Sequence, residues 1–140
     1  MFAGSLALAF AAALAGAGLY LNWVEQPSRL ALEDSALLKE WAPSDQRGFA
    51  LHATLALLSA ICGLSAWFSS GDPRFAIGAV VAILVWPYAF FVLAPLNNQI
   101  LTLSSRDIGA VRSLIRQWGL LEYGQTGLAL AATVIFLWTL

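Results

Sequence analysis

The sequence FAIGAVVAILVWPYAFFVLAPL runs from Phe75 to Leu96 without a charged side chain. At about 1.5 Å per residue, a helix of this length crosses a hydrocarbon core of roughly 30 Å. Three further stretches are similarly long and almost free of charge: Phe2–Val24, Gly48–Phe68 and Trp118–Leu140. The sequence therefore predicts an all-α integral membrane protein, a four-helix bundle that forms one domain over residues 1–140.

The composition agrees with a membrane protein and argues against several functional classes. The 140 residues are 60% hydrophobic and 11% charged, whereas soluble domains have about 25% charged residues. The net charge is -1 and basic residues form no run, so we expect no nucleic-acid partner. With one cysteine and one histidine in the chain, we expect no conventional metal site of His and Cys ligands.

The first long connection, Glu25–Arg47, carries more than half of the charged residues. Its apolar residues recur at roughly helical spacing: Leu30, Leu37, Leu38 and Trp41. This pattern predicts a short amphipathic helix at the membrane interface, with Trp41 as an anchor and Pro43 as its end. Ser44 or Asp45 would then cap the next spanning helix.

The second long connection, Asn97–Gln117, also has a helical pattern. Ser104-x-x-Asp107 resembles a capping box. The apolar residues that follow form one stripe: Ile108, Val111, Ile115 and Trp118. We therefore expect a second interfacial amphipathic helix that runs into the last spanning helix.

Small residues and a proline indicate how the spanning helices pack. Ala12-x-x-x-Gly16 and Ser59-x-x-x-Gly63 have the spacing that lets helices approach closely, so we expect both pairs at helix contacts. Pro87 lies inside the third span, where it removes a backbone donor and bends a helix. Because the freed carbonyl needs a partner in lipid, the bend should face protein or a cavity.

The basic residues predict an orientation. The two long connections lie on the same side of the membrane and hold six of the seven basic residues: Arg29, Lys39, Arg47, Arg106, Arg112 and Arg116. By the positive-inside bias, both connections face the cytoplasm and both termini lie outside, in a membrane such as the bacterial inner membrane.

Polar residues near membrane depth are candidates for function. They gather at the helix ends that face the two connections: Asn22, Gln26, His52, Asn97, Asn98, Glu122, Tyr123 and Gln125. In a four-helix bundle these ends converge, and helices commonly build sites there.

Glu122 lies one turn inside the last span, where it could accept a proton from a substrate. The alternative is an ion pair at the interface with one of three arginines: Arg29, Arg112 or Arg116. His52 could be a base, an axial ligand of a bound tetrapyrrole, or an interfacial histidine bonded to backbone or water. The pair Asn97-Asn98 could orient a ligand or simply end a helix.

Three segments resemble the anthrone-oxygenase-like family of small four-helix membrane proteins. WPYAFFVLAPLNN, Trp86–Asn98, is similar to a family segment with a Pro-Tyr pair followed by Pro-x-Asn. NWVEQPSR, Asn22–Arg29, resembles a segment that often reads His-Pro-x-Arg in the family. WGLLEYGQT, Trp118–Thr126, resembles Trp-x-x-x-His-x-x-Arg-Thr. Some family members oxidise anthrones to anthraquinones with oxygen and no evident cofactor.

The chain departs from the family pattern at positions where this oxidation would need a base or a polar side chain. Gln26 stands where His is common, Glu122 replaces a second His, and Gln125 replaces an Arg. The direct matches are Pro27, Arg29, Pro95 and Asn97. The departures favour a non-catalytic accessory subunit of a larger membrane complex, with other membrane protein subunits, pigment or lipid as partners.

The alternative is a cofactor-independent, oxygenase-like enzyme that acts on an aromatic, lipid-soluble substrate. In that case the resemblance implies that Glu122 accepts a proton while Asn97 and Gln26 orient the substrate. The residues expected to line the pocket are Tyr88, Trp118 and Asn98.

Overall fold

The computed structural model describes residues 2–104 and 106–140, which are helical apart from short turns. The elements in order are α1 (Phe2–Tyr20), η1 (Leu21–Glu25), α2 (Gln26–Leu30), α3 (Asp34–Ser70), α4 (Pro73–Ile83), α5 (Val85–Tyr88), η2 (Ala89–Leu93), α6 (Ala94–Leu103) and α7 (Ile108–Leu137), where η1 and η2 are π-helical turns. No strand occurs in the described residues. The predicted all-α fold class is confirmed.

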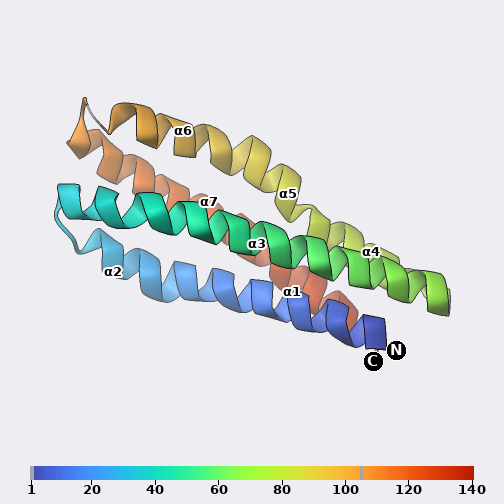
Figure 1. Ribbon diagram of the computed structural model, residues 1–140. Helices are drawn as coiled ribbons and strands as arrows, with labels where there is room; N and C mark the ends of the chain where they lie inside the picture. The colour runs from blue at the N-terminus through green and yellow to red at the C-terminus, as the bar shows by residue number, and fades with distance from the viewer. Residues whose placement is uncertain (1, 105) are drawn as a thin grey trace.

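Four helical units are long and apolar enough to cross a membrane: Phe2–Leu30, Asp34–Ser70, Pro73–Leu103 and Ile108–Leu137. They run up and down in alternation, so both termini lie at one end of the bundle and both connections lie at the other (Figure 1). α1 packs against α3 and α7, and α4 packs against the same two helices. The predicted four spans are confirmed, although each unit is longer than its uncharged stretch.

The charged connections are mostly extensions of the spanning helices. α3 already begins at Asp34 and continues through Pro43, so the prediction of a separate helix that ends at this proline is wrong. Trp41 is completely buried rather than at an interface, and it stacks edge-on against Trp118 with 5.8 Å between ring centroids. Burial of so large a side chain favours a continuous helix despite the proline.

The second connection agrees better with its prediction. The amphipathic segment forms the beginning of α7 and runs into the last span without a break. The capping residue is Asp107, whose carboxylate accepts a hydrogen bond from the Ala110 backbone N–H at 3.0 Å. It therefore takes the N-cap position expected at Ser104.

A tight turn joins α3 to α4 at the end that carries the termini. Gly71 ends α3 with φ at 75°, a left-handed conformation that glycine adopts without steric cost. Asp72 then caps α4 by accepting the Arg74 backbone N–H at 3.0 Å. The Arg74 side chain and this N–H hold the pKa of Asp72 below its usual value. The stabilisation is present above the unfolded-state pKa of Asp72 and is lost as the pH falls through the folded-state value.

Small residues allow close packing, but only one of the two predicted pairs is used. The Ser59 hydroxyl donates to the Ala7 carbonyl at 2.9 Å, and Gly63 lies against the Phe136 ring. Ala12 and Gly16 are exposed, so their predicted packing role is wrong. α1 instead turns a neighbouring face inward: Gly4, Ala7, Ala11, Leu14, Ala15 and Gly18.

We expect Gly78→Val to destabilise the bundle, because a Cβ at this position would come within 2.5 Å of the Phe136 ring. Overpacking of this kind costs about 1–3 kcal/mol. Gly127→Val is the matched control, since a Cβ there meets nothing within 4 Å. Thermal unfolding in mild detergent should show a lower midpoint for the first variant only. Equal midpoints would show that α4 and α7 are not in close contact.

The bend predicted at Pro87 is present. Regular α-helix is interrupted at Leu84 and α5 begins at Val85, because Pro87 has no N–H to offer the carbonyl one turn earlier. The third unit changes direction here (Figure 1). Before the bend α4 packs against both α3 and α7, whereas after it α6 packs closely against α7 and reaches α3 through side chains such as Asn97.

Each π-helical turn stands immediately before an X-Pro pair. η1 precedes Gln26-Pro27 and η2 precedes Ala94-Pro95. The Gln26 and Ala94 backbone N–H groups close the wide turns by bonding to the carbonyls of Leu21 and Ala89. Single π turns often occur at functional sites, and these two flank the polar end of the bundle.

Candidate functional site

Two amides of η1 and α2 bind the backbone of α7. Asn22 Nδ2 donates to the Gly119 carbonyl at 3.2 Å, and its Oδ1 accepts from the Thr126 hydroxyl at 2.7 Å. Gln26 Nε2 donates to the Ile115 carbonyl at 3.0 Å. Gly119 leaves no room for a Cβ beside the Gln26 side chain. These amides hold α1 and α2 against α7.

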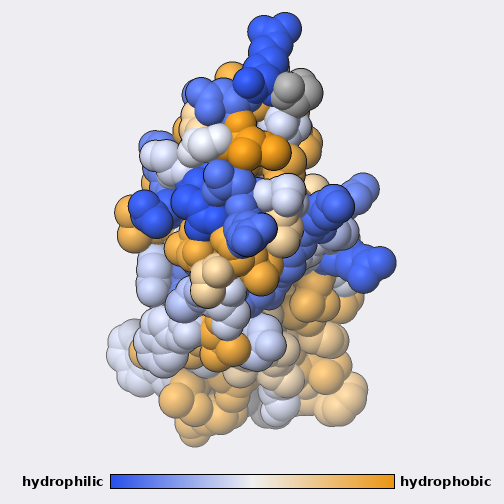
Figure 2. Space-filling model, turned by 90° about the vertical axis from the view of Figure 1, so that its left-hand side faces the viewer, coloured by the Kyte–Doolittle hydropathy of each residue, from blue (hydrophilic) through white to orange (hydrophobic). Residues whose placement is uncertain are grey.

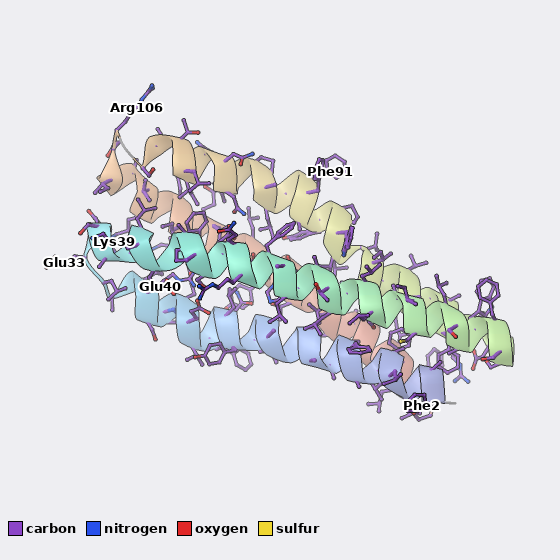
Figure 3. All side chains as sticks on the ribbon, in the orientation of Figure 1. Phe2, Glu33, Lys39, Glu40, Phe91 and Arg106 are labelled. Carbon is purple, nitrogen blue, oxygen red and sulfur yellow. The ribbon has the colours of Figure 1, made fainter. Side chains whose placement is uncertain are left out.

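Arg29 is the centre of a buried ionic cluster. Its side chain is 1% exposed, and its guanidinium pairs with Glu25 and, at 2.7 Å, with Glu40 of α3. It also donates to the Ser44 hydroxyl at 3.0 Å and lies 5.3 Å from the Trp118 ring centroid. Figure 3 shows Glu40 between the ribbons of α3 and α2. The cluster therefore ties α2 to α3 and α7.

A small polar cavity lies beside this cluster, between α3, η2, α6 and α7. Its polar lining comes from three of these elements: Ser44, Asp45 and His52 of α3, Asn97 of α6, and Glu122 and Gln125 of α7. Leu21, Phe49, Leu93 and Trp118 supply apolar walls. Its volume of about 10 Å³ is enough for about one water molecule.

Glu122 faces this cavity without a partner. The residue is 5% exposed, and its carboxylate makes no hydrogen bond or ion pair with any residue that the structure describes. Arg29 is occupied by Glu25 and Glu40, as described above. Arg112 binds Asp34 and the Leu30 carbonyl, both at 2.7 Å.

Arg116, the remaining basic candidate, is exposed. The ion pair between Glu122 and an arginine, the alternative that the sequence left open, is therefore not formed within the described part of the chain. A buried carboxylate without a compensating partner is costly, and ionisable groups in such settings are concentrated at functional sites.

Asp45 is a member of the site that the sequence assigned only to helix capping. It lies inside α3, and both of its carboxylate oxygens accept from Asn97 Nδ2, at 3.1 and 3.2 Å. It also lines an open groove of about 600 Å³ between α3 and α6. Its spacing of seven residues from His52 places both on one face of a helix and could have indicated this role.

His52 pairs with Gln125 across the bundle. The amide nitrogen of Gln125 lies 2.7 Å from His52 Nδ1, and both residues are buried. Behind this pair, a groove of about 260 Å³ opens between α3 and the α5–η2 segment. A tetrapyrrole is larger than this groove, so the geometry gives no support for an axial-ligand role.

The structure brings some of the predicted site residues together and separates others. Glu122, Asn97 and Trp118 line the same cavity. Gln26 does not line it, because its amide is bonded to α7 backbone. Tyr88 donates its hydroxyl to the Leu121 carbonyl and lines none of the pockets described above. Asn98 lies only in the outer groove, between α3 and α6.

The comparisons with known proteins give one match. The model of the family described as anthrone oxygenase matches residues 41–135, more than half of the chain. The match includes the cavity residues of α3, α6 and α7, whereas the segment Asn22–Arg29 lies outside it. No curated protein and no solved structure matches the chain.

Proposed function

Because the chain belongs to the anthrone oxygenase family, we propose that it is a membrane enzyme that oxidises an aromatic, lipid-soluble substrate with molecular oxygen. Glu122 is the base in this proposal. The observation that supports it is the unpaired Glu122 carboxylate, buried and aimed into a cavity that it shares with Asp45, His52 and Asn97. Buried ionisable groups of this kind are characteristic of functional sites in membranes.

The reaction balances without a bound cofactor. Glu122 removes a proton from a methylene group between aromatic rings, and the rings delocalise the negative charge. The carbanion adds oxygen to form a peroxide, which takes the proton back from Glu122. Loss of water from the hydroperoxide leaves a ketone. One O₂ is consumed, one of its atoms enters the product, the other leaves as water, and the carboxylate is regenerated.

Asp45 and Asn97 complete this site. The Asn97 amide holds the Asp45 carboxylate where the cavity meets the open groove between α3 and α6. In the proposed mechanism this groove provides the path to water. Oxygen uptake by the purified chain in lipid vesicles supplied with an anthrone tests the proposal. We expect one O₂ to be consumed for each ketone formed, well above the rate in protein-free vesicles.

A non-catalytic accessory subunit is the second candidate. It is favoured by aromatic side chains that are exposed on η2: Phe90 is 67% and Phe91 is 73% exposed. Figure 3 shows Phe91 pointing away from the bundle, where it could pack against another membrane protein subunit, a pigment or lipid. Purification in mild detergent separates the two candidates, since a stoichiometric partner without oxygen uptake would support the subunit.

The proposed location is a bacterial inner membrane, with the connections in the cytoplasm. Glu33 and Lys39 lie at one end of the bundle with Arg106, while Phe2 lies at the other (Figure 3). Viewed from the connection end, the surface carries many hydrophilic side chains (Figure 2). The positive-inside bias assigns this end to the cytoplasm.

We expect alkaline phosphatase fused to the C-terminus to be active, because the fusion would lie outside the cytoplasm. The same enzyme fused after residue 33, at the first connection, is the matched control and should be inactive. The opposite pattern would reverse the topology.

A further inference from the structure

The groove behind His52 has the features of a ligand site that is open to the membrane. Its walls are aromatic or aliphatic side chains of α3, α5 and η2, among them Phe49, Trp86 and Phe90. These three are 47%, 45% and 67% exposed, and they lie in helical units that are long and apolar enough to cross a membrane. The groove exists because the bend at Pro87 carries the second half of its helical unit away from α3. With these units in a bilayer, hydrocarbon would border its opening.

The floor of this apolar groove is polar. His52 is 6% and Gln125 is 5% exposed, and both line the groove. Because an amide nitrogen can only donate, His52 Nδ1 accepts the hydrogen bond from Gln125. In the neutral ring the hydrogen must then lie on Nε2, which makes no hydrogen bond to any described residue. This N–H donor is thus left without a partner among the described residues, on a ring that lines both the apolar groove and the polar cavity.

The groove adjoins the cavity of Glu122. Phe49, His52 and Gln125 line both, so the two spaces are separated only by these side chains. The Trp86 indole N–H fixes one wall by donating to the Ala53 carbonyl of α3 at 2.9 Å. A flat molecule in the groove would have its polar end near His52, with the side chains of His52 and Gln125 between it and the cavity of Glu122.

We propose that this groove admits a flat aromatic ketone or phenol sideways from the bilayer. The His52 Nε2–H then donates a hydrogen bond to the ligand oxygen. Gln125 fixes the His52 tautomer that carries its hydrogen on Nε2. The inference rests on the proposed function in one respect. When Glu122 removes the methylene proton, the negative charge is delocalised onto the same oxygen, where a preorganised donor stabilises it. His52 is accordingly a binding and electrostatic residue, and Gln125 is a positioning residue.

The chain has a single histidine, so ¹⁵N-histidine labelling gives NMR signals from His52 alone. In vesicles, at a pH where the ring is neutral, we expect the hydrogen on Nε2. Gln125→Glu should move it to Nδ1, because a carboxylate accepts from that nitrogen. Gln99→Glu, at an exposed position of α6, is the matched control and should leave it on Nε2.

The ligand part is tested with 1,8-dihydroxyanthraquinone, which has ketone and phenol oxygens but no methylene to deprotonate. Titration into Glu122→Gln vesicles should shift the Nε2 signal to saturation. His52→Phe should weaken binding about tenfold, the effect of one lost hydrogen bond. A hydrogen on Nδ1 in the unsubstituted chain, or an Nε2 signal that the probe leaves unchanged, would overturn the inference. Binding without oxygen uptake would instead contradict only the proposed function.

Discussion

Glu122→Gln should abolish oxidation of an anthrone by the chain in lipid vesicles, with a rate loss of about 10²–10⁴-fold. Glutamine keeps the shape of the side chain and still fits the cavity, but it cannot accept a proton. Because Glu122 makes no hydrogen bond or ion pair with the described residues, the substitution removes no structural contact. Removal of a buried charge should leave the bundle as stable as before, or more so. Initial rates and thermal unfolding midpoints measure the two effects separately.

Glu33→Gln is the matched control for this variant, because Glu33 is exposed at the first connection. It should retain full activity. If Glu122→Gln kept the rate of the unsubstituted chain, Glu122 would not be the base. If it instead lowered the unfolding midpoint or released a bound partner, the accessory-subunit function would be favoured.

Arg29→Gln should cause the largest loss of stability, about 3–5 kcal/mol. The substitution leaves Glu25 and Glu40 facing each other without the cation between them, and it removes the contact with the Trp118 ring. The attachment of α2 to α3 would be lost with it. Thermal unfolding followed by circular dichroism in mild detergent should show a strongly lowered midpoint.

Arg116→Gln removes the same charge from an exposed position on α7 and should change the midpoint little. Equal effects of the two substitutions would mean that the ionic cluster is not needed for stability. A stable Arg29→Gln variant that had lost activity would place Arg29 in the site rather than in the scaffold.

The sequence predicts the number of spans well, because a charge-free run of this length has few alternatives to a membrane helix. It predicts the connections less well. Charges between Glu25 and Arg47 resemble a surface segment, but Trp41 lies in the core and Arg29 is buried among acidic partners. Trp41 and Arg29 both contact Trp118, far along the chain, and no local pattern reveals these contacts.

For the site, the sequence predicts that Glu122 and Asn97 lie at the same end of the bundle, and the structure places them in one cavity. The sequence does not indicate which polar residues are engaged elsewhere. Gln26 and Tyr88 bind backbone carbonyls of α7, whereas Asp45 turns inward to Asn97. These assignments depend on the rotation of each helix about its axis, which small shifts in packing determine.

The most direct test of the base role of Glu122 is hydrogen exchange at the substrate methylene without oxygen. An anthrone is incubated anaerobically in D₂O with vesicles that contain either the unsubstituted chain or Glu122→Gln, and deuterium incorporation is followed by mass spectrometry. The proposed mechanism predicts exchange about 10²-fold or more faster with the unsubstituted chain. Equal rates in the two samples and in protein-free vesicles would contradict it.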